Sequence, residues 1–197
     1  MERELLSNLR EVLLTKKVTF VCMGNSCRSP MAEGLLKHVL QQAPEPLRSV
    51  QVISCGLDTE EGKGAHSDAI VAMNEKGIDI ARHVRRCVSK DIMADSLAIF
   101  AMHCGHIERL EARYPAEMPA DAYLMRELMP QPNGGVFDPC NAGIGAYRTC
   151  RDYMAEAIPS IVTFLSLKII SVLPDGNTGV LKDFSRAVYG MGKWRMT

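Results

Sequence analysis

The chain has 197 residues, enough to bury one ordinary hydrophobic core and within the usual size range of a single domain. Its 23 basic residues balance its 23 acidic ones, and no apolar run approaches the roughly 20 residues that span a bilayer, so neither a nucleic acid nor a membrane is expected as a partner. Seven cysteines, an odd number without a repeated C-x-x-C pattern, favour a reducing compartment, and we expect a cytoplasmic protein.

The chain begins with a segment that does not resemble a signal peptide. Residues 1–17 carry charges throughout, and leucines recur at helical spacing between residues 5 and 14. This pattern predicts a helical extension over residues 1–15, ahead of a main domain that we place at residues 16–168. The last segment, 169–197, gives no clear pattern, and its structure and the oligomeric state cannot be predicted.

The main domain opens with a strand, a loop and a helix in direct succession. Val18 to Cys22 is a β-branched and aromatic run typical of a buried parallel strand. A polar loop with a glycine follows, and from Pro30 onward apolar residues recur with the helical period. Proline suits the first turn of a helix, because its missing N–H would be unpaired there.

The alternation of strand and helix continues to residue 167. Such alternation favours a parallel sheet with right-handed crossovers, so we expect an α/β fold with a four-stranded, mainly parallel sheet and helices on both faces. Pro159 should kink or interrupt the last helix. The remaining predicted elements are strands at 50–54, 96–102 and 122–125, and helices at 67–76, 107–114 and 146–167.

The loop from Cys22 to Ser29 is the strongest candidate site. It lies between the carboxyl end of a strand and the start of a helix, where open α/β sheets bind their ligands. Its backbone N–H groups and the helix dipole can hold a tetrahedral dianion and stabilise a Cys22 thiolate as a nucleophile. Gly24 and Asn25 tolerate the left-handed backbone that such a loop requires, and the planar Arg28 can bind two phosphate oxygens.

The segment Val21–Glu33, with Cys22 followed six positions later by Arg28 and then Ser29, closely resembles the low-molecular-weight protein tyrosine phosphatase family. The resemblance implies the phosphotyrosine protein phosphatase I fold, a phosphorylated protein as substrate, and neither a cofactor nor a metal. It spans residues 17–167 and continues at Ser54-Cys55-Gly56, at Gly77-Ile78-Asp79 with His83, and at Asp138-Pro139.

The resemblance also implies a role for each matching residue. Cys22 would form a cysteinyl-phosphate intermediate, Arg28 would hold the phosphoryl group, and Asp138 would protonate the leaving atom and then activate water. Ser29 would hydrogen-bond the Cys22 sulfur, and Cys27 would form a reversible disulfide with it. The phosphate-binding loop would comprise Met23, Gly24, Asn25, Ser26, Cys27, Arg28 and Ser29, held in shape by Asn25, Ser54 and His83.

Two departures from the tyrosine-specific pattern leave the substrate open. Tyrosine-specific members usually carry an apolar residue in place of Ser26 and an aromatic residue after the Asp-Pro pair, where this chain has Cys140-Asn141. A small hydroxyl residue at Ser26 resembles the protein arginine phosphatases, and the acids Asp58, Glu60 and Glu61 are expected beside the pocket. From the family resemblance we expect hydrolysis of phosphotyrosine, and because of these departures we keep protein arginine phosphatase as the alternative.

A third reading is a thioredoxin-coupled arsenate reductase, whose loop is similar and which uses two further cysteines. Cys104 lies close to the position of the first, but the next cysteine is Cys140, and Pro30 stands where these reductases carry glutamine. The run His103–His106 is interpreted as a polar loop and not as a metal site, because adjacent residues point in different directions. A phosphoprotein-binding module without activity is disfavoured, because Cys22, Arg28 and Asp138 are all present.

Overall fold

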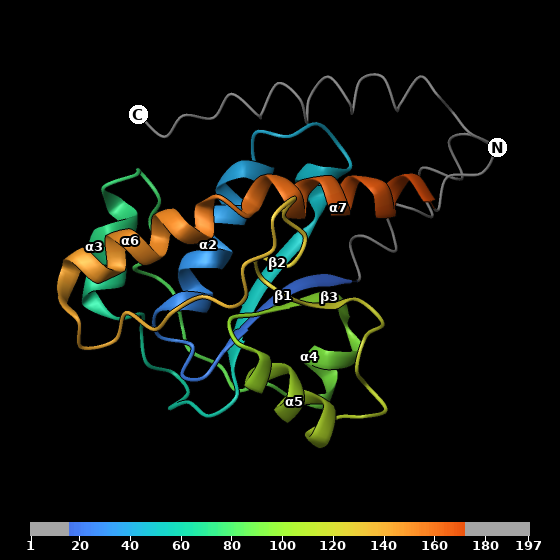
Figure 1. The fold of residues 1–197 in the computed structure, drawn as a ribbon, viewed down its shortest axis with the longest axis horizontal. Coiled ribbons are helices and arrows are strands. Elements are labelled where there is room, and N and C mark those ends of the chain that lie inside the picture. Colours follow the sequence, from blue (N-terminus) through green and yellow to red (C-terminus); the bar gives the residue numbers. More distant parts are fainter. Residues whose placement is uncertain (1–15, 172–197) are drawn as a thin grey trace.

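The structure, a computed structural model, describes residues 16–171 (Figure 1). The helix expected within residues 1–15 and residues 172–197 of the tail lie outside the described residues. Within residues 16–171, no helix is long and apolar enough to cross a membrane.

The sheet has four strands, as expected, and every pairing in it is parallel. The strand order is β2-β1-β3-β4, so β1 lies between β2 and β3, and the register sets Cys22 opposite Gly56. The carboxyl ends of β1, β2 and β3 therefore meet at one edge of the sheet, and the candidate loop leaves from this edge. The strands are β1 (Lys17–Cys22), β2 (Gln51–Gly56), β3 (Ser96–Ala101) and β4 (Ala122–Leu124).

Helices cover both faces of the sheet, as the sequence predicts (Figure 1). The larger core cluster lies under α2, α3, α6 and α7, and the smaller one under α4 and α5. Phe20 belongs to the first cluster and its neighbour Val21 to the second, because successive side chains of a strand point to opposite faces. The helices are α2 (Arg28–Leu40), the 3-10 turn η1 (Leu47–Ser49), α3 (Ser67–Asn74), α4 (Lys90–Ala94), α5 (Cys104–Arg113), α6 (Gly143–Ala155) and α7 (Ile158–Ser171).

The predicted helix over residues 146–167 is two helices, α6 and α7. Pro159 stands in the first turn of α7, where its missing N–H costs nothing. The Ala157 N–H donates to the Met154 carbonyl, and the Ile161 N–H donates to the Ala157 carbonyl, so the chain turns between the helices without losing these bonds. The expected interruption is confirmed, and it lies at residues 156–157, just before Pro159.

The polar loop expected at His103–His106 is wrong, because α5 already begins at Cys104. His103 is its N-cap, and its Nδ1 accepts a hydrogen bond from the Gly105 N–H at 3.1 Å. The short helix α4 was not predicted; the Ser89 hydroxyl caps it by accepting a hydrogen bond from the Ile92 N–H at 3.2 Å.

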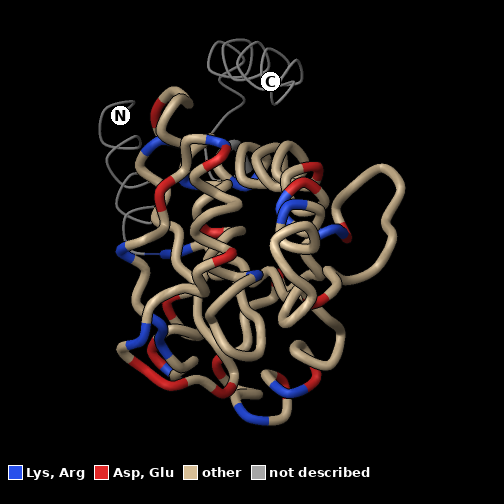
Figure 2. The backbone as a smooth tube through the Cα atoms, turned by 90° about the vertical axis from the view of Figure 1, so that its left-hand side faces the viewer, with Lys and Arg blue, Asp and Glu red and all other residues tan. Residues whose placement is uncertain are grey.

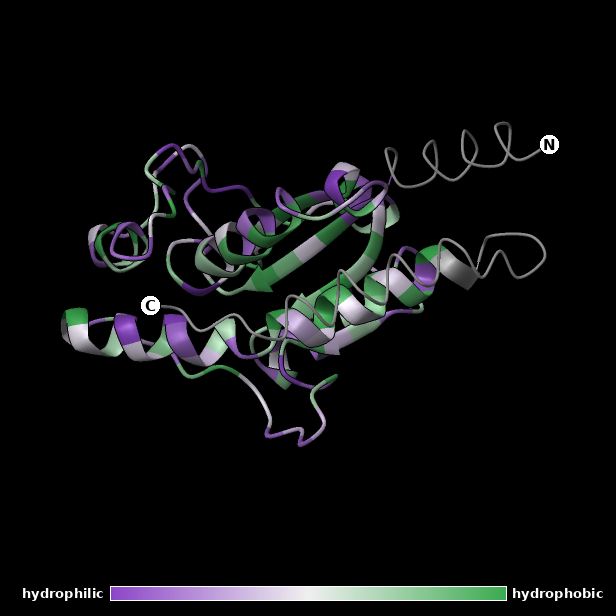
Figure 3. Cartoon of the chain, turned by 90° about the horizontal axis from the view of Figure 1, so that it is seen from above, coloured by the Kyte–Doolittle hydropathy of each residue, from purple (hydrophilic) through white to green (hydrophobic). Residues whose placement is uncertain are grey.

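Charges of both signs are mixed along the visible face of the backbone, in agreement with the balanced composition (Figure 2). Hydrophobic residues are concentrated on the strands and on the sides of the helices that face them, while the outer sides are largely hydrophilic (Figure 3). The feature of the fold that matters for the site is the edge of the sheet at which the carboxyl ends of β1, β2 and β3 meet.

Candidate active site

The Cys22 sulfur lies inside the loop that joins β1 to α2. It accepts a hydrogen bond from the Asn25 N–H at 3.2 Å, and the Ser29 hydroxyl lies 2.9 Å from it. Cys22 is only 2% exposed, and α2 begins at Arg28 directly behind it. The expected contact between Ser29 and the Cys22 sulfur is present, in a setting with two hydrogen-bond donors and a helix N-terminus.

Asn25 holds the loop in its bent conformation. Its φ of 47° lies in the left-handed region, which asparagine tolerates better than most residues. The side chain is fully buried; its amide nitrogen donates to the hydroxyls of Ser29 (3.0 Å) and Ser54 (2.9 Å), and its oxygen accepts from the Arg86 N–H (3.0 Å). Asn25 and Ser54 therefore lie where the sequence reading expected loop-supporting residues.

His83 and Glu33 extend this network behind the loop. The His83 Nε2 lies 3.0 Å from the Asn25 carbonyl oxygen, and the Ser54 hydroxyl donates to Glu33 Oε2 at 2.6 Å. Burial lowers the pKa of His83 by more than its bond to Asn25 and the charge of Glu33 raise it. The sequence reading gave Glu33 no role, although a glutamate within the otherwise apolar run at residues 30–36 was a usable signal.

Gly56 allows β2 to approach the loop closely. A Cβ at this position would lie 2.8 Å from the Met23 carbonyl oxygen, which no real side chain permits. Just beyond it, the Leu57 N–H donates to the Cys22 carbonyl and the Asp58 N–H to the Met23 carbonyl, both at 3.0 Å. The segment after β2 thus lies along the edge of the loop.

Arg28 and Asp138 meet at the open side of the loop. The Arg28 side chain is almost buried, and its Nη1 donates to the Val136 carbonyl at 3.3 Å while Nη2 is ion-paired with Asp138 Oδ2. The acid loop, the segment between β4 and α6 that carries Asp138, is attached to the end of β3, because the Val136 N–H donates to the Met102 carbonyl at 2.8 Å. The two residues come from positions 110 apart in the chain, and the fold brings them into an ion pair that the sequence did not predict.

Cys27 lies on the other side of the loop, against a tyrosine that the sequence reading missed. Its sulfur is 3.2 Å from the Tyr147 hydroxyl and 3.4 Å from the Ser26 hydroxyl. Burial raises the pKa of the Cys27 thiol, and Tyr147 is itself fully buried and stacked on His66. Burial thus favours the protonated form of the Cys27 thiol.

His106 is a second residue near the site that sequence reasoning missed. It is 5% exposed, and its Nδ1 has no hydrogen-bond partner among the described residues. Burial, and next the charge of Arg28, lower the pKa of His106 to about 4. A neutral imidazole thus lies buried close to Arg28 and Asp138.

The two residues that directly follow the Asp138-Pro139 pair are not aromatic. Cys140 and Asn141 are exposed there, and the Cys140 N–H donates to Asp138 Oδ1 at 3.2 Å. Of the three acids expected beside the pocket, Glu60 is paired with Lys63, and Glu61 accepts a hydrogen bond from the Cys87 N–H at 2.9 Å. Asp58 is exposed, and within residues 16–171 its carboxylate has no hydrogen bond or ion pair.

Among the remaining cysteines, Cys104 is the one nearest in sequence to the first relay cysteine of the reductases. Cys104 is exposed at the first position of α5, and its sulfur lies 3.8 Å from His103 Nδ1. All seven cysteines are free thiols, and within residues 16–171 no three His, Cys, Asp or Glu side chains gather as they would around a metal ion.

Comparisons with known proteins agree with this geometry. The family model described as low molecular weight phosphotyrosine protein phosphatase matches residues 17–169. A protein-arginine-phosphatase of Geobacillus stearothermophilus is 32% identical over 142 residues, which are 72% of this chain and 90% of that protein. The structure of the YwlE arginine phosphatase from the same organism has a TM-score of 0.70 at 29% identity and covers 79% of this chain and 96% of its own.

Two other kinds of relative correspond to the alternatives that the sequence leaves open. A probable low molecular weight protein-tyrosine-phosphatase, EpsP, of Ralstonia solanacearum is 32% identical over 104 residues, 53% of this chain and 67% of that protein. An arsenate reductase of Staphylococcus aureus is 40% identical over only 84 residues, 42% of this chain and 57% of that protein. Because the family model matches most of the chain, the protein belongs to the low-molecular-weight phosphotyrosine protein phosphatase family and is a cysteine-dependent phosphatase.

Proposed function

We propose that the protein removes phosphoryl groups from proteins through a cysteinyl-phosphate on Cys22, and that phosphoarginine is its preferred substrate. The observation that carries the proposal is the Cys22 sulfur, which lies within the loop and meets the Asn25 N–H and the Ser29 hydroxyl. The free state of all seven cysteines supports our further proposal that it works in the reducing cytoplasm.

In the first step the Cys22 thiolate attacks phosphorus in line, and the bond from phosphorus to the leaving atom breaks. Asp138 gives its proton to that atom, while Arg28 and the loop N–H groups neutralise the charge on the three phosphoryl oxygens. In the second step water attacks the cysteinyl-phosphate and Asp138 takes the proton of that water. Phosphate and the Cys22 thiolate are then released, and the Ser29 hydroxyl stabilises the departing sulfur.

The preference for phosphoarginine is supported by the surroundings of the loop. No aromatic residue directly follows the Asp138-Pro139 pair to stack on a phenol ring, because Cys140 and Asn141 occupy these positions; the exposed Phe137 precedes the pair. Ser26 is small and polar, and the uncommitted Asp58 carboxylate lies at the edge of the loop, where it can pair with a guanidinium. The relatives named protein-arginine-phosphatase also match 72% of the chain.

Phosphotyrosine, the first expectation from the sequence, is the second candidate. It is favoured by the description of the family model and by the similarity to EpsP. Arsenate reduction is not proposed, because the next cysteine after Cys104 is Cys140, on the acid loop and not in the same short segment.

The test compares kcat/KM for a phosphoarginine peptide, a phosphotyrosine peptide, and arsenate with thioredoxin. We expect the highest value for the phosphoarginine peptide. Asp58→Asn should lower that value about tenfold, the size of one charge-assisted contact, and leave an aryl phosphate unaffected. Glu60→Gln is the matched control, because this exposed acid is already paired with Lys63. A higher kcat/KM for phosphotyrosine would overturn the preference, and arsenate turnover alone would overturn the phosphatase proposal.

A further inference from the structure

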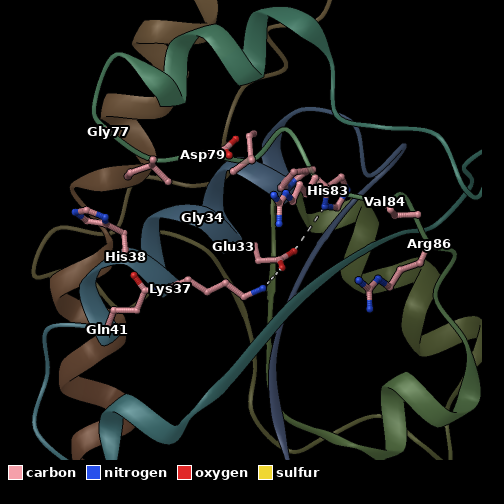
Figure 4. Close-up of a pocket in the computed structure, with 14 residues that line it drawn as sticks. Glu33, Gly34, Lys37, His38, Gln41, Gly77, Asp79, His83, Val84 and Arg86 are labelled. Carbon is pink, nitrogen blue, oxygen red and sulfur yellow. Dashed lines mark hydrogen bonds and ion pairs between the residues drawn. The ribbon is translucent and has the colours of Figure 1, made fainter.

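A second pocket lies behind the catalytic loop, on the outer side of α2 (Figure 4). It has a volume of about 490 Å³, within the usual range of small-molecule sites. Its walls are the outer side of α2, the turn at residues 77–80 and the segment 82–86. No residue between Cys22 and Arg28 lines it, whereas Pro30 and Glu33, which follow the loop in α2, do.

The pocket carries an excess of positive charge. Lys37, Arg82 and Arg86 stand against Glu33 and Asp79. The charge of Glu33 is already used, because one of its oxygens is paired with Lys37 and the other accepts from the Ser54 hydroxyl. Figure 4 shows this carboxylate in the middle of the view, with dashed lines to Lys37 and His83.

The two arginines keep their guanidinium groups for another partner. In the part of the chain that the structure describes, neither Arg82 nor Arg86 has a side-chain hydrogen bond or ion pair. Asp79, the remaining acid, accepts a hydrogen bond from the Ala81 N–H at 2.7 Å, which satisfies part of its charge locally. Two planar, uncommitted guanidinium groups suit a phosphate or phosphonate better than a neutral ligand.

Two apolar side chains contribute to the pocket between α2 and the turn. Ile78 and Ile80 line it with 8% and 7% of their surface exposed, and Gly34 lets them pack directly on the helix, because a Cβ on Gly34 would lie 2.8 Å from a methyl group of Ile80. A ligand with an anionic group for the arginines and a small apolar body for the isoleucines would match both sides of the pocket.

The wall of the pocket is bonded to the catalytic loop. His83 and the Arg86 backbone N–H both contact Asn25, and Glu33 reaches Asn25 through the Ser54 hydroxyl. Asn25 in turn contacts the Cys22 sulfur and Ser29. A molecule in the pocket would therefore touch residues that hold the nucleophile in place.

We propose that this pocket binds a small organic phosphate or phosphonate with an apolar body, and that its occupation changes turnover at Cys22 through Asn25. The binding is independent of the substrate of the enzyme, whereas the effect on turnover depends on the phosphatase function proposed above. If the enzyme turns over an aryl phosphate and a ligand bound in the pocket does not change the rate, the link to Cys22 is refuted and the phosphatase function still stands.

The binding test uses benzylphosphonate, which cannot be hydrolysed, and an Arg28→Ala background that removes the phosphate clamp of the active site. Calorimetry should show one binding site, and adding Arg86→Gln should weaken it about tenfold or more, the loss expected for one charged contact. Adding Arg48→Gln, the same change at an exposed arginine outside the pocket, should leave the affinity unchanged. No binding in the Arg28→Ala background, or equal affinity in the two double variants, would overturn the proposal.

A second measurement uses the wild-type enzyme and does not depend on the folding of a variant. Benzylphosphonate should shift the amide NMR signals of Gly34 and Gly77, which line the pocket and lie outside the catalytic loop. At saturating aryl phosphate, where competition at Cys22 is removed, it should still change kcat, and Arg86→Gln should abolish the change. Unshifted glycine signals, or an unchanged kcat, would contradict the binding and the link to the loop, respectively.

Discussion

The Ser29 hydroxyl lies 2.9 Å from the Cys22 sulfur and 3.0 Å from the amide nitrogen of Asn25. Because that amide nitrogen can only donate, the Ser29 oxygen accepts from Asn25, and its own proton has two acceptors, the Cys22 sulfur at 2.9 Å and the more distant Cys55 carbonyl at 3.4 Å. The bond from Asn25 therefore leaves the Ser29 proton to the nearer sulfur. The arrangement places a hydrogen-bond donor on the Cys22 sulfur, where it would also serve the sulfur that leaves the proposed cysteinyl-phosphate.

Ser29→Ala should slow the breakdown of the cysteinyl-phosphate more than its formation, because the departing sulfur loses its hydrogen-bond donor. A bond to a charged group contributes about 1.5–3 kcal/mol, so we expect kcat to fall roughly 10- to 100-fold. Burst kinetics with an aryl phosphate separate the two steps. Ser166→Ala, at a buried serine that bonds within α7, is the control. An unchanged breakdown rate would contradict the role of Ser29.

Asp138→Ala should slow substrates with poor leaving groups far more than activated aryl esters. General acid catalysis contributes about 10²- to 10⁴-fold, and a nitrophenolate needs little of it. The check is kcat/KM for a phosphopeptide and for 4-nitrophenyl phosphate, with Asp95→Ala, an exposed acid at the opposite end of β1, as control. Equal losses on both substrates would argue against Asp138 as the proton donor.

Cys27→Ser should make inactivation by peroxide irreversible. We expect wild-type activity to return on treatment with a thiol, because the disulfide that we propose between Cys22 and Cys27 would protect the nucleophile from further oxidation. The variant should recover much less, while its activity before oxidation stays close to that of the wild type. Full recovery of Cys27→Ser would show that another residue, or none, protects Cys22.

Stability should fall as the pH drops from about 6.5 to about 4, and His106 should account for part of the loss. In the folded protein, burial and the charge of Arg28 lower the pKa of His106 to about 4, whereas an unfolded histidine titrates near 6.5. The unfolded chain then binds more protons in this interval, at up to about 1.4 kcal/mol per pH unit for one group. Urea unfolding at several pH values measures the slope. His106→Gln should reduce it, and an identical slope would contradict the prediction.

Much of the fold could be predicted from the sequence because its periodic pattern is local. The strand expected at Val18–Cys22 is observed at Lys17–Cys22, and the one expected at 96–102 is observed at Ser96–Ala101. The short helix α4 was missed, since five residues are too few to show a helical period. The start of α5 was missed because it depends on His103 acting as a cap, which histidine does less often than serine or aspartate.

The site divides in the same way between local motif and tertiary contact. Cys22, Arg28 and Ser29 lie in one short segment, and their spacing could be recognised without knowledge of the fold. Tyr147 and His106 come from separate helices and reach the loop only after packing, so no local pattern marks them. Of the three acids expected beside the active site, only the structure shows that Glu60 and Glu61 are bonded elsewhere, whereas Asp58 has no partner within residues 16–171.

The central claim is that Cys22 carries the phosphoryl group during turnover. Rapid quenching of Asp138→Ala during aryl phosphate turnover, followed by peptide mass spectrometry, tests this most directly, because this variant should hydrolyse the intermediate slowly. We predict the added mass of one phosphoryl group on the peptide that contains Cys22, and its absence in Cys22→Ala together with loss of turnover. A phosphoryl group on another residue, or a Cys22→Ala variant that still turns over substrate, would contradict the account.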